Sequence, residues 1–228
     1  MIYTIHDIGG RDEQQDRFAV HYVDGRPKAF VVVDGMGGHD RGAEAADIAL
    51  DAFLAALSRV SVTDYGLRTA LTSAAAAVCD MVPGSGFGAP GACLTALVID
   101  GDRRMLAHVG DTMLWAYQGE SWWRRSAHHA DPASGILILS LGGGSSPAEV
   151  EHRGQVADAG HADAYLLATD GLVHSERVRR GWGRSWMAVD PPCGDCDEGT
   201  LGRLLARSRE AGEDDNATGI LWIPKGAL

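Results

Sequence analysis

The sequence predicts an α+β fold, a four-layer αββα sandwich in which two antiparallel β-sheets pack centrally and helices cover both outer faces. Three observations predict it. Strand-like segments occupy the start and the middle of the chain, two helical segments lie between them, and a last helix precedes a final apolar strand. Because each helix and each sheet must bury an apolar face, helices around a strand-dominated centre favour this layered arrangement.

The first part of the chain reads as three strands followed by two helices. The strands are expected over about residues 2–8, 17–22 and 28–33, and the third contains a continuous apolar run typical of a buried strand. The helices are expected over residues 43–57 and 65–82. Apolar side chains recur at helical spacing in the first, and a Pro-Gly pair ends the second.

The rest of the chain returns to strands before one more helix. Residues 93–117 are interrupted by Gly-Asp turns and are expected to form two or three antiparallel strands. Residues 181–197 are expected to be an irregular connection, with a helix over about 198–211 and a strand over 220–223 after it. With 228 residues, 45% of them hydrophobic, and no linker, the chain is expected to be a single catalytic domain over 1–228.

Charge and hydropathy exclude several classes of protein. The net charge of −11 would repel nucleic acid and anionic membranes, so neither is expected as a partner. No run approaches the roughly 18 apolar residues of a membrane helix, and the first segment is acidic rather than apolar. We therefore expect a cytoplasmic protein.

Four aspartates, Asp16, Asp34, Asp170 and Asp215, stand beside glycine, glutamine or asparagine close to predicted strands. Asp34 and Asp170 each follow an apolar run, so each is expected where a buried strand ends and a turn begins. Carboxylates crowded at strand ends repel one another unless cations lie between them. Oxygen ligands of this kind suit Mg²⁺ or Mn²⁺, and the pattern therefore points to hydrolysis at phosphorus.

Five short motifs carry a resemblance to a known family. They are Arg11 to Asp16, the Asp-Gly-Met-Gly-Gly-His block at Asp34 to His39, Val-Gly-Asp-Thr at Val109 to Thr112, the block from Leu166 to Leu172, and Asp-Asn-x-Thr at Asp215 to Thr218. Each is weak alone, because Asp-Gly pairs are common in turns. In this order over nearly the whole chain, they make the sequence resemble a small bacterial metal-dependent Ser/Thr phosphatase of the protein phosphatase 2C type.

The resemblance implies a centre of two Mn²⁺ or Mg²⁺ ions. Asp34 would bridge both ions, with the carbonyl of Gly35 also reaching a metal once the backbone turns there. Asp170 and Asp215 would complete the first ion, and Asp16 would hold the second. A water bridging the two ions would then be the nucleophile, and free phosphate the product.

Other residues of the motifs are expected to support this centre. Arg11 matches the phosphate-binding arginine of the family, and its planar guanidinium suits two phosphoryl oxygens. His39 and Asn216 are expected to hold the surrounding segments rather than to meet the substrate. Asp111 is expected to be a structural residue in a turn.

Three departures from the family pattern bear on the chemistry. Met36 stands where animal and plant relatives have a candidate general acid, so the proton donor is unassigned. The flap is shortened to the few residues between positions 130 and 141. His128-His129 replaces an Asp-His pair, which removes a carboxylate that in relatives helps hold a third metal. A third ion is therefore expected to be weak or absent, and the alternative is that His128 lies on a truncated surface loop.

The resemblance implies hydrolysis of phosphoserine and phosphothreonine in proteins. The substrate would be a phosphoprotein made by a bacterial Ser/Thr kinase, and the enzyme would be a monomer. Two alternatives remain: a non-catalytic phosphoprotein-binding regulatory domain, and a hydrolase of small phosphoesters. The four aspartates and Arg11 disfavour the first, because a binding module does not need a repulsive acidic cluster.

Overall fold

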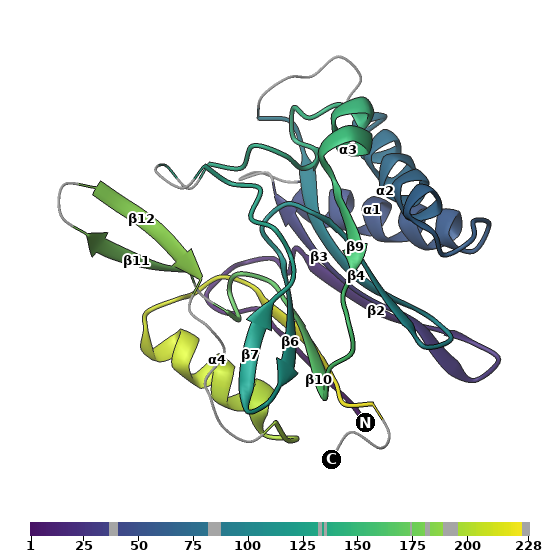
Figure 1. The fold of residues 1–228 in the computed structure, drawn as a ribbon. Helices are drawn as coiled ribbons and strands as arrows, with labels where there is room; N and C mark the ends of the chain where they lie inside the picture. The colour runs from purple at the N-terminus through teal and green to yellow at the C-terminus, as the bar shows by residue number, and fades with distance from the viewer. Residues whose placement is uncertain are drawn as a thin grey trace.

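Two antiparallel β-sheets form the centre of the molecule (Figure 1). The computed structural model describes residues 1–36, 41–81, 88–131, 134, 136–173, 175–180, 183–188 and 196–224. Sheet I contains, in spatial order, β1 (Ile2–Asp7), β13 (Ala217–Trp222), β10 (Ala164–Ala168), β6 (Met113–Gln118) and β7 (Ser121–Arg124). Sheet II contains β2 (Asp16–Val23), β3 (Arg26–Met36), β4 (Gly91–Asp100), β5 (Arg103–Val109) and β9 (Gln155–Asp158), and β8 (Leu141–Gly142) pairs with β4.

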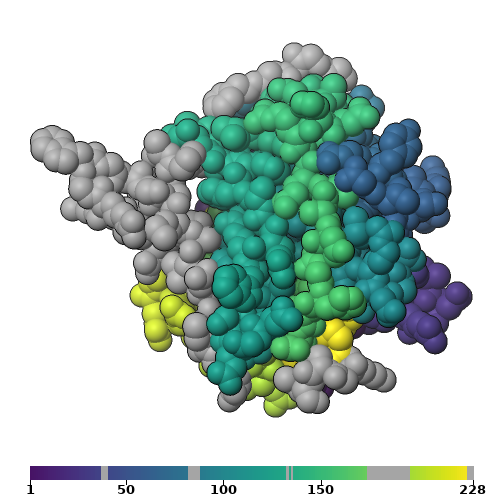
Figure 2. Space-filling model, viewed as in Figure 1, coloured from purple at the N-terminus to yellow at the C-terminus, as the bar shows by residue number. Residues whose placement is uncertain are grey.

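Helices cover the outer face of each sheet. The helices α1 (Gly42–Leu57) and α2 (Asp64–Cys79) pack on sheet II, with α3 (Pro147–Arg153) against α2, and α4 (Thr200–Glu210) packs on sheet I. In the space-filling view the blue α1–α2 pair and the yellow-green α4 lie on opposite sides of the molecule (Figure 2).

Local sequence explains where two of these helices begin. The Thr63 hydroxyl accepts a hydrogen bond from the Gly66 N–H at 3.1 Å and caps α2. Ser146 and Glu149 form a reciprocal capping box at α3, with Pro147 in the first turn. Both signals are readable in the sequence, although α3 was not predicted.

Alternation along the strands builds three separate apolar layers. On β3, Val31 and Val33 face α1 and α2, whereas Phe30 and Val32 face sheet I. The inter-sheet layer also takes Leu167 from β10, along with residues of β4, β5, β6 and β13. A third layer fills the space between sheet I and α4. Three apolar layers between four structural layers confirm the predicted αββα sandwich.

Several expected elements differ in detail from those observed. The segment 93–117 resolves into three strands, the upper number expected. Part of the expected irregular connection is the strand β12 (Gly183–Ala188), which pairs with β11 (Ser175–Arg180). The last expected helix is observed as α4, which covers the outer face of sheet I. None of the helices described is long and apolar enough to cross a membrane.

The largest correction concerns Asp34 and Gly35. They do not mark a turn, because β3 continues to Met36 and both residues pair with β4. Glycine is needed at position 35 for another reason. A Cβ there would lie 2.1 Å from the Gly42 carbonyl oxygen and 2.8 Å from that of Gln15. At position 35, α1 and the chain before β2 therefore approach the strand too closely for a side chain.

We expect Gly35→Ala to destabilise the fold by about 1–3 kcal/mol or more, because the added methyl group must push backbone atoms apart. Urea denaturation measures the change. The matched control is Gly202→Ala in α4, where a Cβ meets nothing within 4 Å; there alanine should stabilise the helix by up to about 1 kcal/mol. Equal stability of Gly35→Ala and the wild type would contradict the close approach.

Candidate metal centre

The apolar inter-sheet layer ends in carboxylates at one end. On β3 the side chains of Phe30, Val32 and Asp34 point to the same face, so Asp34 continues the inter-sheet layer. Asp16 begins β2 and is the register partner of Asp34 across the two strands. The side chain of Asp16 is buried, with 2% of the residue exposed. Two of the predicted ligands therefore lie on neighbouring strands of sheet II.

The other two predicted ligands come from tight segments beside sheet I. Asp170 follows β10, and Asp215 precedes β13, its neighbouring strand. The two segments touch closely, since a Cβ on Gly171 would lie 2.0 Å from the Asn216 carbonyl oxygen. From α4, the buried Ser208 hydroxyl donates to the Gly171 carbonyl oxygen at 2.6 Å. Close backbone contact and this hydrogen bond together set where Asp170 lies.

The four aspartates influence one another electrostatically, which places them in one region. Burial raises the pKa of Asp34 well above its ordinary value, and the charges of Asp170, Asp16, Asp111 and Asp215 raise it further. Burial also dominates the raised pKa of Asp170, followed by Asp111 and Asp215. Asp34 and Asp170 still keep some exposed surface. Carboxylates enclosed by protein, mutually repelling and open to solvent on one side, match what a cation site requires.

Asp16 is perturbed less because hydroxyl groups support its charge. Burial raises its pKa to about 6, and hydrogen bonds from Thr218 and Thr169 oppose the rise. The Thr169 hydroxyl donates to Asp16 Oδ2 at 2.9 Å. Hydrogen bonds to the charged form favour it over the neutral acid. Asp16 is thus the carboxyl group most readily ionised among the three whose pKa is raised.

The donor set fits Mg²⁺ or Mn²⁺ in chemistry, because it consists of carboxylate oxygens. In the part of the chain that the structure describes, no three His, Cys, Asp or Glu side chains are yet gathered around one point. Binding of an ion there would therefore have to draw the carboxylates closer together.

Arg11 reaches the same cluster. Its guanidinium donates to Asp215 Oδ2 at 2.7 Å, and 53% of the Arg11 side chain remains exposed. The loop before β2 therefore brings a half-exposed cation to the edge of the acidic region, where it would meet an incoming anion.

Asn216 holds that loop in place. Its amide group donates to the carbonyl oxygens of Ile8 and Glu13 at 2.9 and 3.1 Å, and its Oδ1 accepts from the Gln15 N–H at 2.8 Å. Its backbone N–H donates to Asp215 Oδ1 at 2.8 Å. One side chain thus ties the segment that carries Arg11 to the segment that carries Asp215. Such ties orient groups that bind a metal.

Asp111 is a member of the cluster that sequence reasoning treated only as a turn residue. It is the strongest charged neighbour raising the pKa of Asp170, and it also raises that of Asp34. Its Oδ1 is buried without a hydrogen-bond partner in the structure. The turn between β5 and β6 was readable from Gly110, whose φ is +106°, but its nearness to the other aspartates was not.

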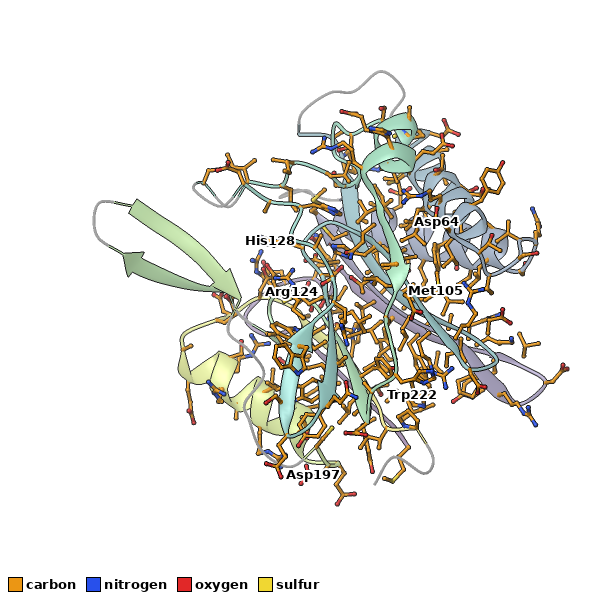
Figure 3. All side chains as sticks on the ribbon, viewed as in Figure 1. Asp64, Met105, Arg124, His128, Asp197 and Trp222 are labelled. Carbon is orange, nitrogen blue, oxygen red and sulfur yellow. The ribbon has the colours of Figure 1, made fainter. Side chains whose placement is uncertain are left out.

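His128 lies near the cluster but among basic groups. Figure 3 shows it beside Arg124, near the end of β7. Burial lowers its pKa, Arg124 lowers it further, and Asp111 raises it. It is half-buried rather than fully exposed. His39 lies outside the described residues.

Comparison with known proteins settles the family. A family model described as protein phosphatase 2C matches residues 8–196. The chain belongs to the protein phosphatase 2C family. No curated protein matches the sequence.

Solved structures share the fold of this phosphatase-family chain at low sequence identity. MsPP, a PPM Ser-Thr phosphatase from Mycobacterium smegmatis, is 20% identical with a TM-score of 0.70, and 97% of each chain is covered. Stp1 from Staphylococcus aureus is 16% identical with a TM-score of 0.73, covering 99% of this chain and 95% of that one. The PstP catalytic domain, solved with two manganese ions, is 21% identical with a TM-score of 0.67, covering 97% and 96%.

The raised pKa values predict how metal binding should vary with pH. In the folded, metal-free protein Asp16 has a pKa of about 6 against an ordinary value of 3.8, so its protonated form stabilises the fold and this contribution is lost as pH rises through about 6. Mn²⁺ must displace that proton. We therefore expect the rise in Tm caused by Mn²⁺ to grow between about pH 5 and pH 7.5. At a hundredfold excess of Mn²⁺ over Kd, the gain in the free energy of unfolding should reach about 2.7 kcal/mol.

Differential scanning calorimetry with and without Mn²⁺ measures this effect. Taking the difference cancels the contribution of titratable groups that Mn²⁺ does not affect. Asp64→Asn, on the exposed side of α2, is the control that should leave the difference unchanged. A Tm that ignores Mn²⁺ at every pH would mean that the aspartates are not a metal site.

Proposed function

We propose that this protein hydrolyses phosphoserine and phosphothreonine in proteins with the help of two divalent ions. The observation that carries the proposal is the convergence of Asp16, Asp34, Asp170 and Asp215, from four separate segments, at one open end of the inter-sheet layer. Membership of the protein phosphatase 2C family supports the same reaction. A non-catalytic binding module is not favoured, since it would gain nothing from a buried repulsive cluster.

The four aspartates would coordinate the two ions between them. Asp34 belongs to sheet II, and the charges of Asp16, Asp170 and Asp215 all act on it, so its carboxylate would serve both ions and the Gly35 carbonyl would add a further oxygen ligand. Asp170 and Asp215 would complete the coordination of one ion, and Asp16 would bind the other. When bound, two such ions supply a nucleophilic water at neutral pH and neutralise charge on the phosphoryl oxygens.

Arg11 would bind the phosphoryl group of the substrate. In the structure its guanidinium pairs with Asp215, and a cation held at the edge of an anionic site offsets the general negative field of a protein with net charge −11. A phosphate dianion entering the site would replace this carboxylate as the partner of the arginine. The fork of donors then fixes two phosphoryl oxygens.

The choice of metal and the number of ions depend on the chemistry of the donor atoms. Oxygen donors suit Mn²⁺ and Mg²⁺ alike, and a weak third ion would find the unpartnered Asp111 oxygen more suitable than neutral His128. The chain would act as a single catalytic domain and a monomer, on the product of a bacterial Ser/Thr kinase in the cytoplasm. His39 and Asn216 would hold segments around the site.

The proposal predicts that Asp34→Asn lowers kcat at least ~10³-fold, about 4 kcal/mol of barrier, because one shared carboxylate charge is lost from the centre. The assay is Mn²⁺-dependent phosphate release from a phosphothreonine peptide, with p-nitrophenyl phosphate in parallel. Asp102→Asn, in the exposed turn after β4, is the control of equal charge change. Near-normal activity of Asp34→Asn would refute the two-ion centre, and turnover of the small ester alone would favour the phosphoesterase alternative.

Arg11→Ala should act on substrate binding. We expect KM to rise and kcat/KM to fall about ten- to a hundredfold, more than kcat falls, because a charge-assisted hydrogen-bond pair worth about 1.5–3 kcal/mol is removed. Arg11→Lys keeps the charge without the fork and should lie between the two. An unchanged KM in Arg11→Ala would remove this residue from the phosphate site.

A further inference from the structure

A row of hydrogen-bonded groups links the edge strand β1 to Asp16. His6 and Thr218 are register partners on β1 and β13, and His6 Nδ1 lies 2.9 Å from Thr218 Oγ1. The Thr218 N–H donates to the Thr169 hydroxyl at 2.9 Å, and that hydroxyl donates to Asp16 Oδ2. Thr218 also hydrogen-bonds to Asp16 through its side chain. The row therefore reaches the carboxylate by two routes.

Strand alternation explains why these residues meet. Ile220 and Trp222 on β13 face the inter-sheet layer, so Thr218 faces it too, and Ile2 places His6 on the same side of β1. Thr169 and Thr218 are fully buried. Buried hydroxyl groups need partners in the protein, because water does not reach them.

The protons of this row can be assigned from its acceptor. An ionised carboxylate can only accept hydrogen bonds, so each threonine hydroxyl that bonds to Asp16 must donate its single proton to it. The Thr218 oxygen then has only lone pairs to offer to His6. Nδ1 of His6 must therefore carry the proton and donate it. With Nδ1 unprotonated, the Thr218 hydroxyl would turn towards the imidazole and leave Asp16.

We propose that His6 is a positioning residue for the metal-binding carboxylate of Asp16. By donating from Nδ1 to Thr218, it aims the Thr218 hydroxyl at Asp16 and so fixes the orientation of the carboxylate. The inference rests on the proposed function, in which Asp16 holds one ion. The contact of the His6 ring with Phe18, 5.4 Å between centroids, is a packing interaction that any side chain of similar shape would keep in part.

Two nearly isosteric variants separate hydrogen-bond direction from packing. His6→Asn can place an amide N–H where Nδ1 lies, whereas His6→Asp can only accept. Mn²⁺ titration of the metal-free protein by calorimetry is the main readout, with kcat and KM as a second. We expect the Mn²⁺ affinity of His6→Asn to stay within about threefold of the wild type. In His6→Asp the affinity for one of the two ions should fall about 10- to 100-fold, the range for residues that orient metal ligands.

Controls distinguish this inference from simpler explanations. Thr4→Asp puts the same charge two residues away on the same face of β1, and it should leave Mn²⁺ affinity near that of the wild type. Equal affinities of His6→Asn and His6→Asp would overturn the proposal, as would a Thr4→Asp loss as large as that of His6→Asp. Asp16→Asn tests the underlying function. If Asp16→Asn weakens Mn²⁺ binding while the His6 variants do not, only the role of His6 is refuted. If Asp16→Asn leaves Mn²⁺ binding unchanged, the metal-binding role of Asp16 is refuted as well.

Discussion

The repulsion among carboxylates enclosed at one end of the inter-sheet layer is the constraint on which the rest of the site depends. Burial and neighbouring charges raise the pKa of Asp34 and Asp170 well above the ordinary range. Such groups would separate or protonate unless the backbone held them and a cation compensated them. Close backbone contacts therefore hold the repelling side chains near one another. Bound ions would compensate their charge.

The holding contacts are non-local and mostly made by small or polar residues. Gly35 lets β3 touch α1, and Gly171 lets the Asp170 segment touch the chain beside Asp215. Asn216 binds the loop of Arg11, and Ser208 reaches from α4 to Gly171. Because all of these act on backbone atoms, ligand positions depend on rigid elements rather than on flexible side chains, which is what a metal site needs for defined geometry.

Much of the architecture was predictable from local pattern. The strand at 28–33, the helix at 43–57 and the αββα order follow from periodicity and turn residues, and the structure confirms them. The helix α3 was missed although its capping box is present in the sequence. The hairpin β11–β12 was missed because its segment carries no clear strand periodicity. The extension of β3 through Asp34 and Gly35 was missed because an Asp-Gly pair is usually a turn.

The sequence by itself determined which residue types the centre uses, because carboxylates next to apolar strands and an arginine at motif spacing are properties of the chain. It also determined the order of the main helices and strands, although not α3 or the β11–β12 hairpin, and it carried the motifs of the family. Only the tertiary structure decided that Asp111 joins the cluster, that Arg11 pairs with Asp215, and that His6 and Thr169 meet the hydrogen-bond network of Asp16. The physical reason is that these contacts join residues of different strands, and which strand faces end together depends on how the two sheets pack.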